Sequence, residues 1–201
     1  MAIDQGARRG VMWGGLVLLA GLGGCAAGAL VATDPPVLEQ VGAHTVRLAG
    51  RDVWVVVDTR YAAANLGADW LILDLAVTAT DRHAATVRRD AIFVRTPAGR
   101  RVPLATQAEL AHAYSVLRVR TRQASIVASP LLAYFPRARQ GCWFQFFVEP
   151  GTSVSFDTVS LNDQRACVER LYFRVEGGVT GGRWMLGVDL EESDVRVPFQ
   201  L

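Results

Sequence analysis

The side chains that most often carry out chemistry are few in this 201-residue chain, and they are widely spaced. Among His44, His83 and His112, no two have the H-x-x-H or H-x-x-x-H spacing of a metal-binding pair. Ser125 and Ser129 lie in no G-x-S-x-G motif, the pattern that surrounds the nucleophile of α/β-hydrolases. We therefore expect no catalytic residue, no metal and no cofactor.

Oxygen-bearing side chains gather in two segments that we expect to be loops. They are Glu191, Glu192 and Asp194 in one segment and Asp157, Asn162 and Asp163 in the other. Calcium binds several loop oxygens at once, so a calcium-binding module is one alternative function. The regular D-x-D-x-D spacing of an EF-hand loop does not occur in either segment.

Cys25 ends a segment with the features of an export signal. The pair Arg8-Arg9 precedes an uncharged apolar stretch over residues 11–22, and small residues follow it. The sequence Leu22-Gly23-Gly24-Cys25 resembles the lipobox of bacterial lipoproteins. This resemblance implies that residues 1–24 are a signal peptide, that cleavage occurs before Cys25, and that the Cys25 sulfur carries a diacylglycerol thioether.

The lipobox also implies a location for the protein. Acyl chains on Cys25 would hold the protein in a bilayer, because each buried methylene group adds about 0.8 kcal/mol. We expect an exported protein anchored in the cell envelope, at the outer membrane on its periplasmic side or at the cell surface. An uncleaved helix over residues 11–32 is the alternative, since that segment is uncharged and long enough to span a bilayer.

The other two cysteines lie on the apolar sides of predicted strands. Cys142 shares a strand face with Phe144 and Phe146, and Cys167 shares one with Leu171. An even pair in an exported domain predicts a disulfide between Cys142 and Cys167, worth about 3 kcal/mol for a loop of this length. Two buried free thiols are the alternative.

A stretch rich in arginine is the strongest candidate for a contact surface. Residues 118–139 hold five arginines and no acidic residue, and an apolar segment bounded by Pro130 and Pro136 lies among them. The candidate contact residues are Arg118, Arg120, Arg122, Leu131, Leu132, Tyr134, Phe135, Arg137 and Arg139. If they share a face, they fit anionic headgroups or an acidic protein partner. A solvated helix end and an apolar segment folded into the core are the alternatives.

Strand patterns dominate the remaining chain. Residues 53–57 form a β-branched run, residues 71–77 alternate between two faces, and residues 184–201 predict a terminal hairpin. Thr106 and Glu109 have the spacing of a capping box, which predicts a helix over about residues 107–120.

Part of this pattern resembles the first half of immunoglobulin-like domains in exported bacterial lipoproteins. The resemblance rests on residues 70–78, on Ile92-Phe93-Val94 and on the turn Pro97-Ala98-Gly99-Arg100. It implies a mainly β fold, an immunoglobulin-like antiparallel β-sandwich with one inserted α-helix. We expect this domain over residues 44–201, after the lipidated cysteine and a tether over residues 25–43.

Composition and charge narrow the classes of function. Hydrophobic residues make up 51% of the chain, and the formal net charge is only +2, so nucleic acid is not an expected partner. We expect a non-catalytic, membrane-anchored domain that binds an envelope protein or supports envelope assembly. An envelope hydrolase whose site combines residues far apart in the sequence is the other alternative, beside the calcium- or ligand-binding module.

Overall fold

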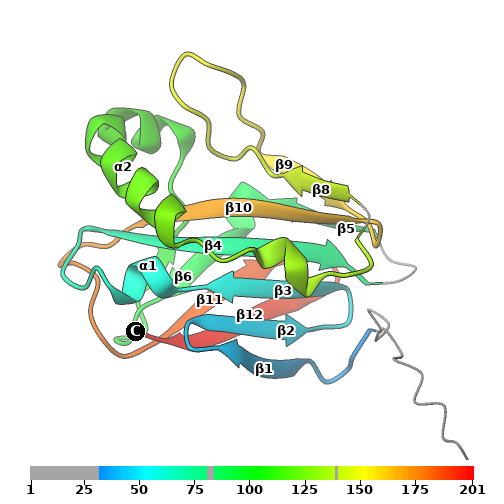
Figure 1. Ribbon diagram of the computed structural model, residues 1–201. Helices are drawn as coiled ribbons and strands as arrows, with labels where there is room; N and C mark the ends of the chain where they lie inside the picture. The colour runs from blue at the N-terminus through cyan, green and yellow to red at the C-terminus, as the bar shows by residue number, and fades with distance from the viewer. Residues whose placement is uncertain (1–31, 81–83, 139) are drawn as a thin grey trace, which may run out of the picture.

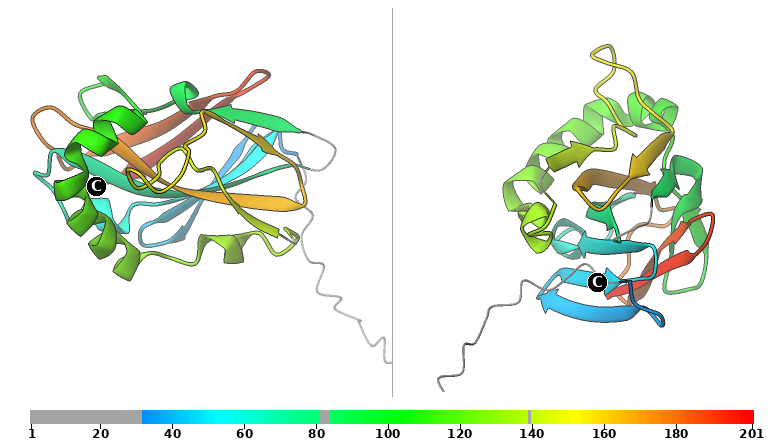
Figure 2. Two further views of the ribbon diagram at one scale, coloured as in Figure 1. Left: turned by 90° about the horizontal axis from the view of Figure 1, so that it is seen from above. Right: turned by 90° about the vertical axis from the view of Figure 1, so that its right-hand side faces the viewer.

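The computed structural model describes residues 32–80, 84–138 and 140–201, in which two β-sheets pack face to face (Figures 1 and 2). The six-stranded sheet has the strand order β1-β2-β3-β4-β10-β8. Its strands are β1 (Val37–Gly42), β2 (Thr45–Ala49), β3 (Val53–Asp58), β4 (Trp70–Ala79), β10 (Arg165–Arg174) and β8 (Gln140–Trp143). All neighbouring pairs in this sheet are antiparallel except β8 and β10, which are parallel.

The second layer is a four-stranded antiparallel sheet with the order β12-β11-β6-β7. Its strands are β12 (Asp194–Gln200), β11 (Arg183–Asp189), β6 (Ile92–Arg95) and β7 (Arg101–Pro103). The remaining elements are the pair β5 (Ala85–Arg88) and β9 (Thr158–Leu161), the helices α1 (Arg60–Ala63) and α2 (Gln107–Val127), and the 3-10 turns η1 (Arg89–Ala91) and η2 (Leu131–Tyr134).

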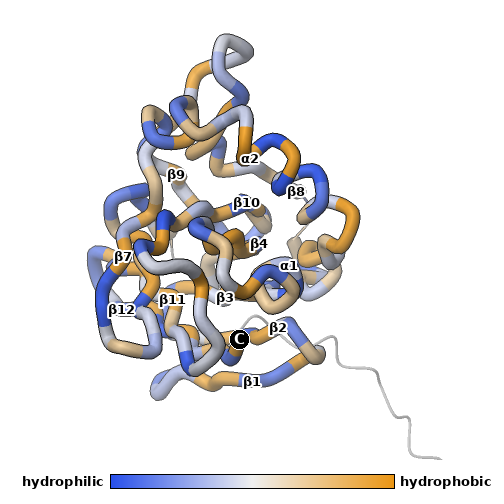
Figure 3. Tube along the Cα trace, turned by 90° about the vertical axis from the view of Figure 1, so that its left-hand side faces the viewer, coloured by the Kyte–Doolittle hydropathy of each residue, from blue (hydrophilic) through white to orange (hydrophobic). Residues whose placement is uncertain are grey.

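The main core fills the space between the two sheets. Alternate residues of β4, namely Leu71, Leu73, Leu75 and Val77, point into it and pack with inward residues of the four-stranded sheet such as Leu186. Polar residues gather in the outer connections, and the strands between them are largely apolar (Figure 3). The alternation seen in the sequence therefore decides which face of each strand is buried.

The six-stranded sheet is also covered on its outer face, the face turned away from the four-stranded sheet. Leu110, Leu117 and Ala124 of α2 recur every seven residues and are buried against Ile72 and Tyr172 on that face. Further along the sheet, Leu131 and Phe135 cover Val56 and Ala76. Coverage on both faces explains why β4 is a nearly continuous apolar run.

The prediction of a mainly β, antiparallel sandwich with an inserted helix is confirmed. The capping box is present, since the Glu109 amide donates to Thr106 Oγ1 (3.1 Å) and the Thr106 amide donates to the Glu109 carboxylate (2.7 Å). The helix continues to Val127, beyond the expected end near residue 120, because no breaker occurs before Pro130 and Ala124 continues the buried stripe.

The boundary of the folded domain differs from the prediction. Residues 37–42, which we expected within a tether over residues 25–43, form β1 and pair with β2. The domain therefore begins before residue 44, because the prolines at 35 and 36 interrupt regular structure only upstream of this strand. The expected signal peptide over residues 1–24 and Cys25 lie outside the described residues.

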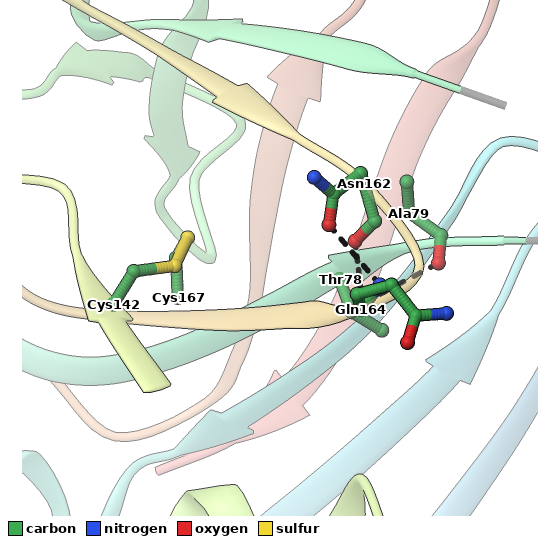
Figure 4. The surroundings of a disulfide bond; sticks show 6 residues. All are labelled: Thr78, Ala79, Cys142, Asn162, Gln164 and Cys167. Carbon is green, nitrogen blue, oxygen red and sulfur yellow. Dashed lines mark hydrogen bonds between the residues drawn. A yellow bond between two sulfur atoms is a disulfide. The ribbon is translucent and has the colours of Figure 1, made fainter. Parts of the chain in front are cut away.

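Cys142 and Cys167 are joined by a disulfide, which confirms the predicted pairing (Figure 4). They stand directly opposite each other on β8 and β10, with their Cα atoms 4.3 Å apart. The strand β8 ends at Trp143, earlier than the sequence pattern predicts. Phe144 and Phe146, which the pattern placed on the same apolar face as Cys142, are nevertheless both buried. Between them, Gln145 adopts a left-handed backbone conformation with φ of 56°.

Candidate functional site

A groove of about 450 Å³ lies on the outer face of the six-stranded sheet, between the C-terminal half of α2 and the turn η2. Its lining residues come from four regions of the chain, namely β4, the end of α2 with the segment that follows it, β8, and β10. They are Asp74, Leu75, Thr121, Ser125, Ala128, Ser129, Pro130, Leu131, Leu132, Trp143, Val168, Glu169, Arg170 and Tyr172. We call this cavity the outer groove.

The floor of the outer groove carries an ion pair between neighbouring strands. Arg170 Nε donates to Asp74 Oδ1 (2.7 Å) and Arg170 Nη2 donates to Asp74 Oδ2 (3.2 Å). Arg170 Nη1 also donates to the Thr121 carbonyl oxygen (2.9 Å) and to Ser125 Oγ (2.7 Å) on α2. The planar guanidinium thus fixes α2 to the sheet while both side chains stay partly open to solvent.

One wall of the outer groove is apolar and exposed. Trp143 is 73% exposed and Leu132 is 42% exposed, although both lie beside buried elements. Trp143 aligns with Val168 in the parallel pair, so its side chain leaves the sheet on the outer face while that of the neighbouring Cys142 points inward to the disulfide. The disulfide and the sheet together hold this tryptophan on a fixed strand.

The hydroxyl groups of the outer groove are engaged in structural hydrogen bonds. Ser129 Oγ donates to the Asp58 carboxylate, which also accepts from the Arg60 amide (2.7 Å). Ser125 Oγ donates to the Thr121 carbonyl oxygen (2.9 Å). Neither serine has a histidine partner in the described part of the chain. The arrangement suits binding by an apolar wall over a polar, charged floor.

A partly buried carboxyl group borders the outer groove from the interior face of β10. Burial raises the pKa of Glu169 to about 7, while hydrogen bonds from the Phe146 and Arg170 amides (3.2 Å each) favour the ionised form. The signal for this residue was available in the sequence. Glu169 interrupts the apolar face that Cys167 shares with Leu171. The sequence pattern does not show that backbone amides of a distant loop, such as that of Phe146, contact its carboxylate.

Arg89 is a buried charged residue that no sequence pattern predicts. Its guanidinium lies over the rings of Phe146 and Phe147, at 5.8 and 5.4 Å from their centroids. It donates to the carbonyl oxygens of Phe146 and Phe156, and it forms an ion pair with Asp157 (3.2 Å). Arg89 therefore holds both ends of the loop over residues 144–157, which projects from the top of the molecule in Figure 1.

The predicted contact arginines do not share one face. Arg118 and Arg122, four residues apart, line the same cavity beside the loop at Phe147. Arg120 lies on the other side of α2, where it interacts electrostatically with Tyr61. Arg137 is exposed after η2, and Arg139 lies outside the described residues.

The apolar segment after α2 also has some residues in the core and others on the surface. Leu131 and Phe135 fold into the core, which was the alternative for this segment, so neither is exposed for contact with a partner. Tyr134 is half-buried, and Leu132 remains exposed beside Trp143. The exposed part of residues 118–139 is therefore smaller than expected. Trp143, which the prediction did not include, lies beside Leu132 in the groove lining.

Several carboxylates of the two candidate calcium-binding segments form ion pairs with arginine. Asp194 pairs with Arg196 (3.0 Å), Glu192 lies 3.6 Å from Arg51, and Asp157 pairs with Arg89. Within the described ranges, no group of three or more His, Cys, Asp or Glu side chains is arranged to hold a metal ion.

Comparison with protein-family models gave no match, and comparison with the curated proteins and with the solved structures gave none either. Among the described residues, no helix combines the length and the apolar character needed to cross a membrane.

Proposed function

We propose that the protein is an exported lipoprotein, held in a bilayer through lipid on Cys25, whose β-sandwich domain binds a partner protein in the envelope without catalysis. The lipobox Leu22-Gly23-Gly24-Cys25 supports the anchor. The disulfide between Cys142 and Cys167 is compatible with export, because such bonds persist in oxidising compartments.

The observation that carries the binding role is the exposed Trp143 on the wall of the outer groove. A tryptophan that is 73% exposed on a disulfide-linked strand loses little conformational freedom when a partner covers it. Leu132 extends the apolar wall, and the Asp74–Arg170 pair offers polar contacts below it. An apolar anchor surrounded by polar groups is the usual composition of a protein-binding hot spot.

A photoreactive amino acid at position 132, introduced in cells that export the protein, tests this role. We expect one defined cross-linked species, which disappears when Trp143→Ala is added, because removing a central tryptophan typically costs about 2 kcal/mol or more of binding free energy. Val154, which is also exposed (73%) but lies on the projecting loop, is the matched control position. Equal cross-linking from positions 132 and 154, or cross-linking unaffected by Trp143→Ala, would refute the proposal.

A further inference from the structure

The solvent side of α2 carries apolar side chains that the fold does not use. Val116, Val119 and Ile126 are 56%, 55% and 84% exposed, and their spacing places them on one side of the helix. The opposite side already packs on the sheet through Leu110 and Leu117. We call Val116, Val119 and Ile126 the outer stripe.

Positive charge predominates beside the outer stripe. The chain has no Asp or Glu between Glu109 and Glu149, while Arg118 and Arg122 lie beside the stripe and are exposed. Within the described part of the chain, neither arginine forms an ion pair. Two carboxylates border this surface: Glu109 closes the capping box, and Glu149, which lines the same cavity as Arg118 and Arg122, accepts a hydrogen bond from Tyr114.

We propose that the outer stripe and its arginines lie against the surface of an anionic lipid bilayer. The apolar side chains would enter the boundary between headgroups and acyl chains, and Arg118 and Arg122 would reach the lipid phosphates with their stems along the apolar surface. The stripe is a convex ridge on a helix, whereas the concave outer groove beside it remains available to a protein. A bilayer supplies the negative charge and the apolar depth that this ridge lacks.

The outer stripe has only three apolar side chains, which is enough for contact with a bilayer if the protein is already anchored there. In this respect the inference rests on the proposed lipid on Cys25. The eight peptide links between Cys25 and Thr33 span at most about 28 Å. Thr33 is fixed to the domain through its hydrogen bonds to Ala49 and Gly50. The second contact is therefore intramolecular, so it needs little affinity of its own. A partner in the outer groove would then be bound close to the bilayer surface.

Fluorescence quenching in reconstituted vesicles tests the contact with the full chain. The variant Ile126→Cys carries a fluorophore, and vesicles of phosphatidylcholine alone or in equal parts with phosphatidylglycerol carry a spin-labelled lipid as quencher. Glu191→Cys, an exposed position in the turn between β11 and β12 of the other sheet, is the matched control. Arg118→Gln/Arg122→Gln removes the charge from the exposed helix surface, and its melting temperature checks that the fold is kept.

We expect lipid quenching at position 126 in the anionic vesicles, which falls to the level of position 191 with the double arginine variant or without phosphatidylglycerol. Equal quenching at positions 126 and 191, or equal quenching in both lipid mixtures, would overturn the proposal. Shielding of position 126 in native membranes but not in vesicles would assign the outer stripe to a protein and also overturn it. The mass of the same sample shows separately whether Cys25 is acylated, so failure of the anchor and failure of the helix contact are distinguishable.

Discussion

Loss of the disulfide between Cys142 and Cys167 has two calculable consequences, one for the whole domain and one for the outer groove. The two cysteines are separated by 25 residues, and closing a loop of that length in the unfolded chain stabilises the folded state by about 3 to 3.5 kcal/mol. With an m-value of about 2 kcal/mol per M in urea, the midpoint of unfolding should fall by roughly 1.5–2 M when the bond is removed.

The local consequence follows from the position of β8. This strand has only four residues, lies at the edge of the sheet and is paired with β10, so its covalent link replaces the hydrogen bonds that a longer strand would make. Without the bond, we expect the amides of β8 to exchange with solvent faster than those of β10, and Trp143 to leave the wall of the outer groove.

Urea unfolding of the oxidised protein, the reduced protein and the variant Cys142→Ala/Cys167→Ala measures the first effect, and hydrogen exchange of β8 measures the second. Alanine keeps both positions apolar, so agreement between the reduced protein and the variant would assign the change to the bond itself. A loss of unfolding free energy below about 1 kcal/mol, or unchanged exchange in β8, would show that the bond does not stabilise the domain and its edge strand in this way.

Three further predictions concern single residues of the fold. Gly187→Ala should destabilise by about 3 kcal/mol or more in thermal unfolding, because a Cβ there would lie 2.2 Å from Phe93 Cζ; a change within experimental error would show that the ring moves freely. The pKa of Glu169 is raised from 4.5 to about 7, so the folded state holds the proton more tightly and stability should fall by about 3 kcal/mol as the pH rises from about 4.5 to 7. Glu169→Gln should remove that fall in pH-dependent urea unfolding, and parallel pH profiles for the two proteins would contradict the assignment. Thr106→Ala should cost about 1 kcal/mol through loss of the capping box with Glu109, seen as a lower melting temperature.

Most of the fold could be predicted because its signals are local. The alternation of Leu71, Leu73 and Leu75 identified the buried face of β4, and the spacing of Thr106 and Glu109 marked the start of α2. The disulfide could be predicted because both cysteines lie on apolar strand faces in a chain whose first residues predict export. The two prolines at positions 35 and 36 predict a tether up to residue 43. Residues 37–42 form a strand instead, because they pair with β2.

The outer groove could not be predicted, because its parts meet only through long-range contacts. Asp74 and Arg170 are 96 residues apart and neither stands out in the sequence, while Trp143 is exposed on β8, a short strand at the sheet edge. The number of arginines in α2 likewise does not predict which of them lie together. Helix geometry places Arg118 and Arg122 together but turns Arg120 to the other side, which a count of charges does not reveal.

Intact mass together with membrane fractionation shows whether lipid on Cys25 anchors the protein. The protein is expressed in a bacterial host beside a Cys25→Ser variant, and both are examined by mass spectrometry and in separated membranes. We predict that the wild-type protein lacks residues 1–24 and gains the mass of acyl chains, while the variant shows neither change. A full-length, unmodified chain in the membrane fraction for both proteins would contradict the lipoprotein account and would favour an uncleaved helix over residues 11–32.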